Sequence, residues 1–325
     1  MHAIQISSYG DPAVVLEHVQ IPEPSAPGPS EVLIAMEFAP VDPSDLLMVR
    51  GLMPLKPELP SIIGTEGVGR VLAVGANVDN VKVGDRVLPP LFSLTWRERL
   101  VTPASGLFAL PTKADVQQLS MLRVNPPTAA LIMSEYIALN PGDWIIQNAA
   151  NSGVGRSAIA IAKARGFKTI NFVRRPDSIA ELEAAGGDLV LVDGPGAAER
   201  VAATVGKGLV RLGLDGISGE ATGRLASFLS PGGTLVGYAL MSGDLIAKVG
   251  MLDLLWKDIS LRGFSLGHTK YDIKIPLVLE ESAQLISLGA LHVPIAAVYP
   301  MTRIKEAAAH VERGGKVILN ISNPS

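Results

Sequence analysis

Residues suited to binding a phosphate group stand together in one turn, Asn151-Ser152-Gly153-Val154-Gly155. An apolar, strand-like run at 144–146 precedes this turn, and apolar residues at helical spacing follow it up to Gly166. Glycines between a strand and a helix let backbone amides approach a pyrophosphate at the positive helix end. Gly-x-Gly alone also suits a purely structural turn, but its place after a strand favours a dinucleotide site.

Two arginines, Arg174 and Arg175, end the next predicted strand, 169–173. NAD-specific proteins usually carry an acidic residue near this place, which binds the ribose hydroxyls. Guanidinium groups can instead pair with the 2′-phosphate of NADPH. A solvated strand end is the plain alternative, but the register with the glycine turn favours NADPH.

The predicted secondary structure that positions these residues follows two patterns, one in each part of the chain. Up to about residue 115 the chain alternates strand and turn, which predicts an antiparallel, partly closed β domain. Beyond it, strands alternate with helices, which predicts a doubly wound parallel sheet. The fold class is therefore α/β.

Composition narrows the choice of function. The chain has 325 residues, 48% apolar and 18% charged, and a net charge of −3, which gives no reason to expect a nucleic acid or an acidic membrane as partner. The absence of cysteine excludes disulfides and cysteine-ligated zinc. Neither a targeting pattern nor an apolar run of membrane-spanning length is visible, so we expect a cytoplasmic protein.

Motifs along the chain carry a family resemblance: EVLI (31–34), GTEGVG (64–69), VGDRV (83–87), PGD (141–143), GGT (232–234) and GKVIL (315–319). Together with the glycine turn they resemble the medium-chain dehydrogenase/reductases. The resemblance implies a GroES-like domain of residues 1–121 and 269–325, a Rossmann domain of residues 122–268, an active site in the cleft between them, and a homodimer.

Further motifs are similar to the zinc-free 2-enoyl thioester reductases, with quinone reductases as close relatives: TWR (95–97), VNPPTA (124–129), QNAANSGVG (147–155), TINFVR (169–174) and KDISLRGF (257–264). With the residues of the turn and the two arginines, the resemblance implies these cofactor-binding residues: Thr128, Asn151, Ser152, Gly153, Val154, Gly155, Arg174, Arg175, Tyr238, Leu240, Met241, Phe264, Leu266 and Lys316.

Two departures from family patterns concern the chemistry. The positions of the zinc ligands in zinc-dependent members hold Asp42, Thr65 and Val124, so no metal site is expected. The tyrosine that enoyl thioester reductases carry before the Pro-Glu-Leu-Pro segment falls at Met53, which cannot donate a proton. Tyr9, the one tyrosine in the first third, lies too early in the chain to stand in. The substrate pocket is expected to be apolar, with contacts from Leu52, Met53 and Leu55.

The leading hypothesis is reduction by NADPH of a carbon–carbon double bond conjugated to a carbonyl, with hydride added at the β-carbon. Donors to the developing oxyanion would assist. The candidates are Ser44, Lys56, Thr65, Trp96 and Asn125, each of which could instead be structural or solvated. A quinone reductase, which depends less on a positioned acid, is the second hypothesis. A protein that binds NADPH without turnover is the third.

Overall fold

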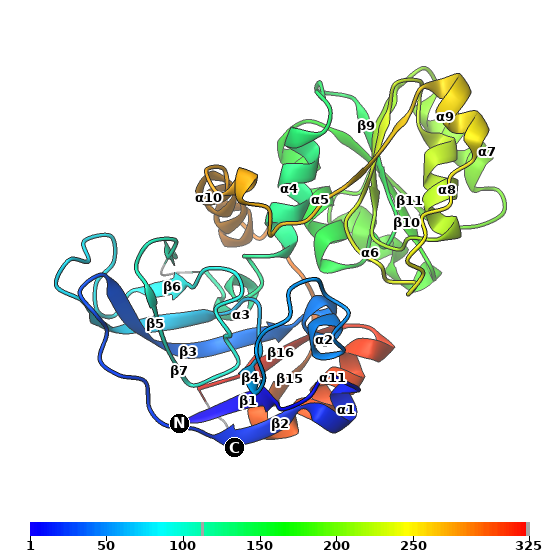
Figure 1. The fold of residues 1–325 in the computed structure, drawn as a ribbon. Helices are drawn as coiled ribbons and strands as arrows, with labels where there is room; N and C mark the ends of the chain where they lie inside the picture. Colours follow the sequence, from blue (N-terminus) through cyan, green and yellow to red (C-terminus); the bar gives the residue numbers. More distant parts are fainter. Residues whose placement is uncertain (112–113, 323–325) are drawn as a thin grey trace. The chain divides into compact units, whose positions relative to one another are not determined.

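A computed structural model describes residues 1–111 and 114–322 of the chain. Contacts divide it into two compact units, each described by itself (Figure 1). The first unit comprises residues 1–124 and the C-terminal segment from His292, and the second comprises Asn125–Leu291. No helix among the described residues is long and apolar enough to cross a membrane.

The first unit is built on a long strand, β3: β5 pairs with one edge of it, while β7 and β16 pair with the other edge, β7 along its first half and β16 near its end. Since β16 is the last strand of the chain, the C-terminal segment completes this sheet, as the GroES-like architecture predicted. Alternating apolar residues of β3 face a core around the fully buried Trp96. The strands are β1 His2–Ile6, β2 Glu17–Gln20, β3 Glu31–Val41, β4 Ser61–Ile62, β5 Val68–Val74, β6 Arg86–Leu88, β7 Arg99–Pro103, β8 Phe108–Ala109, β15 Ile295–Pro300 and β16 Lys316–Asn320.

Short helices close the ends of this unit. α2 begins at Pro43 with Asp42 as its N-cap, because proline at the first helical position lacks the N–H that a helix start leaves unbonded. The helices are α1 Pro12–Val15, α2 Pro43–Val49, α3 Val116–Leu119, the 3-10 turn η3 Met301–Arg303 and α11 Ile304–Arg313.

The second unit contains the predicted parallel sheet. Its strand order is β11-β10-β9-β12-β13-β14, so the chain starts in the middle and reverses direction across the sheet between β9 and β12. This is the order of a dinucleotide-binding Rossmann fold. The strands are β9 Trp144–Gln147, β10 Lys168–Val173, β11 Leu189–Val192, β12 Val210–Asp215, β13 Thr234–Gly237 and β14 Ser260–Gly263.

Helices connect these strands, and three of them, α7, α8 and α9, were not predicted. The last helix, α10, packs on α4 and is held by a two-pronged ion pair of Arg165 with Glu281, at 2.6 and 3.0 Å. The compact unit therefore extends to Leu291, further than the expected domain limit at 268. The helices are α4 Asn125–Glu135, α5 Gly153–Ala164, η1 Pro176–Ser178, α6 Ile179–Ala184, α7 Ala197–Val205, α8 Glu220–Phe228, α9 Met251–Lys257, η2 Thr269–Tyr271 and α10 Ile275–Ser287.

Candidate functional site

The glycine turn lies at the carboxyl end of β9, and α5 begins within it at Gly153. Ser152 is the N-cap, and its hydroxyl oxygen accepts a hydrogen bond from the N–H of Gly155 at 3.1 Å. A Cβ on Gly155 would come within 2.5 Å of the carbonyl oxygen of Ala150, so only glycine fits this close approach. The turn thus places the positive end of α5 at the carboxyl ends of the parallel strands, as a dinucleotide phosphate requires.

Two buried side-chain amides, Gln147 of β9 and Asn171 of β10, hold the turn in place. The side-chain amide of Gln147 donates to the carbonyl of Gly155 at 3.0 Å and to Asn171 Oδ1 at 2.7 Å. Asn171 in turn donates to the carbonyl of Leu189 at 3.2 Å. Buried amides must find such partners, and these tie β9, β10 and β11 to the first turn of α5.

A second polar network occupies the point where the strand order reverses. Asn148 donates to Asp215 Oδ1 at 2.7 Å and accepts from the N–H of Gly216 at 2.8 Å, which joins the ends of β9 and β12. Thr222 donates to the other Asp215 oxygen at 2.5 Å. Ligands of doubly wound sheets bind outside this point. Sequence reasoning did not select Asn148 and Asp215 as site residues, and the Asp-Gly pair after a predicted strand was the available signal.

Arg174 and Arg175 follow β10, which pairs in parallel with β9. They therefore lie at the carboxyl ends of the strands, as the glycine turn does. Both are exposed. Within the part of the chain that the structure describes, neither pairs with a carboxylate. Their guanidinium groups are therefore available to an anion, and their role toward a 2′-phosphate stays a prediction.

The residues predicted beside the nicotinamide divide into two groups. Phe264, Tyr238 and Leu266 pack with Val154 of the turn in one apolar cluster. Leu240 and Met241 lie outside it, with 42% and 56% of their surface exposed. Thr128 is buried in α4.

Three buried polar atoms near the turn lack hydrogen-bond partners among the described residues: the acceptor Gln147 Oε1 and two donors, which belong to Asn125 and Tyr238. The Asn125 side chain lies against Gly153, where a Cβ would come within 2.8 Å of its amide nitrogen, and that nitrogen has no hydrogen-bond acceptor. The Tyr238 hydroxyl lies next to Gly216 and close to Ser152, without a hydrogen bond of ordinary geometry to any described residue, and burial raises the pKa of Tyr238. Buried donors of this kind are satisfied by a ligand or a water. The turn and these donors fit a dinucleotide.

The first unit holds a buried group of ionisable side chains. Lys316 forms an ion pair with Asp42 Oδ1, and its predicted contact with the cofactor stays a prediction. Burial lowers the pKa of Lys316, but Asp42 and Glu66 outweigh this and raise it overall, so the ammonium stays charged. Glu66 Oε2 accepts hydrogen bonds from the N–H groups of Arg123 and Val124 at 2.8 and 2.9 Å.

The remaining oxygens of the two acids, Asp42 Oδ2 and Glu66 Oε1, are buried and meet no conventional donor among the described residues. The Asp42 side chain lies within hydrogen-bond reach of Glu66, and this contact favours the protonated form of Glu66. Burial, reinforced by Asp42, accordingly raises the pKa of Glu66 well above its ordinary 4.5. Burial and Asp42 also raise the pKa of Asp45 to about 7.

Two of the predicted oxyanion donors are committed elsewhere. The Thr65 hydroxyl donates to Asp45 Oδ1 at 2.6 Å. The Trp96 indole is fully buried and donates to the carbonyl of Pro40 at 3.1 Å. Ser44 is half-buried in the first turn of α2, and Lys56 is exposed. The structure therefore gives Thr65 and Trp96 structural roles, while a role for Ser44 or Lys56 stays a prediction.

The positions of zinc ligands in zinc-dependent members, Asp42, Thr65 and Val124, converge on Glu66 and its neighbours. They offer one carboxylate already paired with Lys316, a hydroxyl and an apolar side chain, which is not a zinc-binding set. Across the described residues, no group of three or more His, Cys, Asp or Glu is arranged to hold a metal ion.

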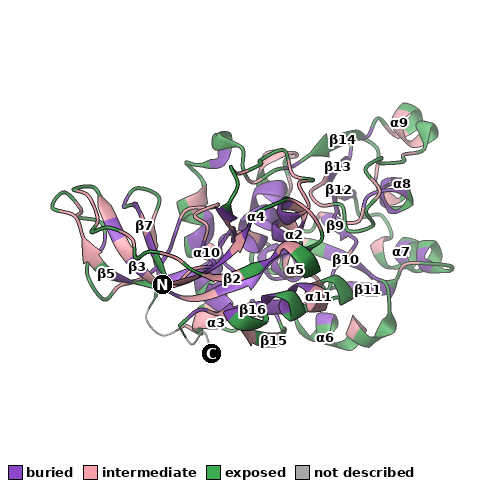
Figure 2. Cartoon of the chain, turned by 60° about the horizontal axis from the view of Figure 1, so that its bottom comes forward, coloured by how far each residue is buried: buried purple, intermediate pink, exposed green. Residues whose placement is uncertain are grey.

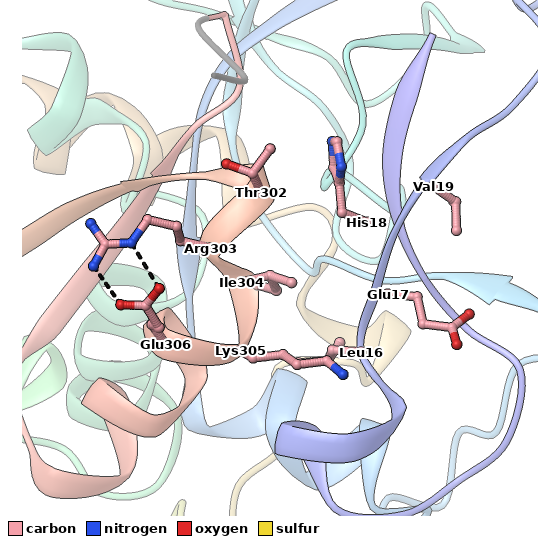
Figure 3. A pocket seen from close by; sticks show the side chains of 9 residues that line it. All are labelled: Leu16, Glu17, His18, Val19, Thr302, Arg303, Ile304, Lys305 and Glu306. Atoms are coloured by element: carbon pink, nitrogen blue, oxygen red, sulfur yellow. Dashed lines mark hydrogen bonds and ion pairs between the residues drawn. The ribbon is translucent and has the colours of Figure 1, made fainter.

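The predicted substrate residues lie on the loop between α2 and β4. Leu52 and Leu55 are exposed, and Met53 packs partly against the core of the first unit. Exposed leucines so close together suit an apolar ligand. A separate hollow of about 390 Å³ lies between β2 and α11 (Figure 3); its lining includes His18 and Lys305 but no residue predicted for the site.

Comparison with known protein families agrees with this geometry. Residues 28–110 match the family model of the alcohol dehydrogenase GroES-like domain, and residues 153–286 match that of the zinc-binding dehydrogenases. The second match begins after the positions of the zinc ligands, so its description implies no metal here. Fold and site together define a medium-chain dehydrogenase/reductase.

The most informative similar proteins identify a smaller family within this class. The mitochondrial enoyl-[acyl-carrier-protein] reductase of Rattus norvegicus is 39% identical over 282 residues, which cover 83% of this chain and 74% of the relative. A quinone oxidoreductase of Pseudomonas syringae is 29% identical, with a TM-score of 0.85 over 98% of this chain and 99% of its own. Etr1p, a 2-enoyl thioester reductase of Candida tropicalis solved with NADP and crotonyl-CoA, has a TM-score of 0.88 over 98% of this chain and 99% of its own; at 24% identity it shows the fold alone. The chain belongs to the enoyl-[acyl-carrier-protein] reductase family.

Proposed function

We propose that the protein transfers hydride from NADPH to the double bond of an α,β-unsaturated carbonyl compound, an enoyl thioester or an enone, without zinc. The protein is an NADPH-dependent oxidoreductase by family. The observation that carries the proposal is the glycine turn at the start of α5, with the unpaired donors of Asn125 and Tyr238 beside it. When bound there, NADPH supplies the hydride.

The side chains around the turn would orient the cofactor. Phe264, Leu266 and Val154 offer an apolar surface, which suits a nicotinamide ring and excludes water. Arg174 and Arg175 would select the 2′-phosphate. The chain provides no tyrosine at position 53, so the proton for the α-carbon comes from water or from another side chain.

A quinone is the alternative substrate class. Reduced quinone oxygens can take protons from solvent, which matches the methionine at position 53, and a quinone oxidoreductase is among the similar structures. Binding of NADPH without turnover has least support, because the cofactor-side geometry is intact.

Turnover assays separate these alternatives. The protein with NADPH is offered crotonyl thioester, simple enones and quinones while the absorbance of the cofactor is followed. We expect oxidation of NADPH with the enoyl thioester at a higher kcat/KM than with quinones. The reverse order favours the quinone reductase, and measurable NADPH binding without turnover of any substrate would sink both enzyme hypotheses.

We also propose that the protein forms a homodimer through the edge of the parallel sheet. β14 is the outermost strand, all four of its residues are exposed, and α9 beside it in the chain is exposed as well (Figure 2). Large apolar side chains gather here: Leu245, Ile246, Met251, Leu252, Leu255, Trp256 and Leu261 are each at least 41% exposed. An unpaired strand edge beside such a surface favours pairing with a second copy about a twofold axis.

A cytoplasmic location stays a prediction, since the curated relatives are named mitochondrial.

A further inference from the structure

The loop that carries the predicted substrate residues has few regular contacts of its own. It spans residues 51–60 between α2 and β4, and Leu52, Leu55 and Leu59 expose 68%, 51% and 37% of their surface. A loop that must hold an apolar ligand in one geometry needs an anchor from outside itself.

Tyr9 supplies such an anchor from the N-terminal segment. Its hydroxyl donates a hydrogen bond to the carbonyl of Pro57 at 2.6 Å. Its ring lies over Gly51, where a Cβ would come within 3.1 Å of the ring, and the backbone there has φ +71°. Both Tyr9 and Met53 pack against the same core, and the ammonium of Lys56 lies 5.9 Å from the ring centroid.

Sheet pairing explains how a residue so early in the chain arrives here. β1 pairs with β4, the strand that follows the loop, with Gln5 opposite Ile62. The next residue after Tyr9, Gly10, donates its N–H to the carbonyl of Val49 at the end of α2, at 3.0 Å. Residues 9 and 10 therefore hold the loop at both of its ends.

We infer that Tyr9 is a positioning residue for substrate: it fixes the loop that carries Leu52, Met53 and Leu55 in the shape that takes the apolar chain of the acyl group. Its hydroxyl is committed to Pro57, so it acts through the loop and does not donate the proton. The inference rests on the proposed function and deepens it, because it assigns chain recognition to this loop.

Tyr9→Phe tests the inference, since it removes only the hydroxyl. We expect KM for a ten-carbon 2-enoyl-CoA to rise about fivefold, KM for crotonyl-CoA to rise less, and kcat to stay within about twofold, as for an interaction made equally in ground and transition states. The Kd of NADPH should not change. Hydrogen exchange of the amides at 51–57 should become faster.

Tyr299→Phe is the matched control, because Tyr299 lies in the same unit and shares its hydroxyl hydrogen bond with His310 at 3.2 Å. It should lower the unfolding temperature without changing either KM. Tyr9→Phe that likewise lowers stability but leaves both KM values and the exchange at 51–57 unchanged would overturn the inference.

A wild-type protein that reduces no enoyl thioester contradicts the proposed function instead, and the exchange at 51–57 then decides the role of Tyr9. Should Tyr9→Phe fail to fold, Tyr9→Leu, which removes the hydroxyl and keeps an apolar side chain against the same core, is judged by the same measurements.

Discussion

At the scale of single residues, the proposed preference for NADPH over NADH rests on Arg174 and Arg175. Both are exposed at the carboxyl end of β10, and the glycine turn lies at the carboxyl end of the neighbouring strand β9. The double variant Arg174→Ala/Arg175→Ala should raise the Kd of NADPH about tenfold or more, which is about 1.4 kcal/mol, and leave that of NADH nearly unchanged. Isothermal titration with both cofactors measures this difference.

Arg200→Ala, another exposed arginine of the second unit, is the control and should change neither Kd. If the preference for NADPH over NADH survives the double variant undiminished, the 2′-phosphate is bound by other residues.

The chemistry available at position 53 could be predicted from the sequence, but the residues around Met53 could not. Its side chain excludes a proton donor at that position, and this follows from the sequence alone. The neighbourhood of Met53 did not follow from the sequence. Tyr9 lies far away along the chain, and only the pairing of β1 with β4 brings it to the loop. Contacts that depend on strand pairing leave no local pattern to read.

At the scale of elements, Glu66 ties three segments together: it accepts hydrogen bonds from the backbone at 123–124 and contacts Asp42, the N-cap of α2. Burial and Asp42 raise the pKa of Glu66 above its ordinary 4.5, so protonation favours the folded state. This stability is fully present below about 4.5 and is lost as the pH rises through the folded-state pKa. The loss is about 1.4 kcal/mol for each pH unit that separates the folded-state pKa from the unfolded-state pKa.

Glu66→Gln keeps both functions without titrating: its oxygen accepts from the two amides, and its NH₂ group donates to Asp42. The variant should therefore gain stability relative to the wild type as the pH rises from about 5 to about 9. Urea unfolding across this range measures the difference. Glu17→Gln, at an exposed position, is the control. A difference between Glu66→Gln and wild type that does not vary with pH would show that Glu66 is already ionised in the folded protein.

Elements with strong local signals were predicted well. The strand predicted at 169–173 is β10, and the helix predicted to follow the glycine turn up to Gly166 is α5, because apolar spacing and flanking glycines mark both. α9 was missed because its apolar residues are exposed and follow no buried face. The buried carboxyl pair could not be predicted either, since it forms only where the end of β3 meets the turn before β5 and the start of β16.

At the scale of the whole molecule, the exposed apolar side chains of α9 and β14 predict assembly. Leu252→Glu/Trp256→Glu replaces two side chains that are 69% and 81% exposed. Glutamates in an apolar interface would be buried without partners, so the dimer dissociation constant should rise about a hundredfold or more, about 2.7 kcal/mol. Sedimentation velocity over a range of concentrations measures it, with NADPH binding as the check that the second unit is folded.

Val14→Glu is the matched control, because Val14 is 68% exposed and belongs to the first unit, whereas α9 and β14 belong to the second. It should leave the oligomeric state as it is in the wild type. A monomeric wild type refutes the homodimer, and a dimer that tolerates both glutamates places its interface elsewhere. If the dimer dissociates as expected, the exposure that hid α9 from the sequence pattern is explained, because its apolar residues face a second copy of the chain.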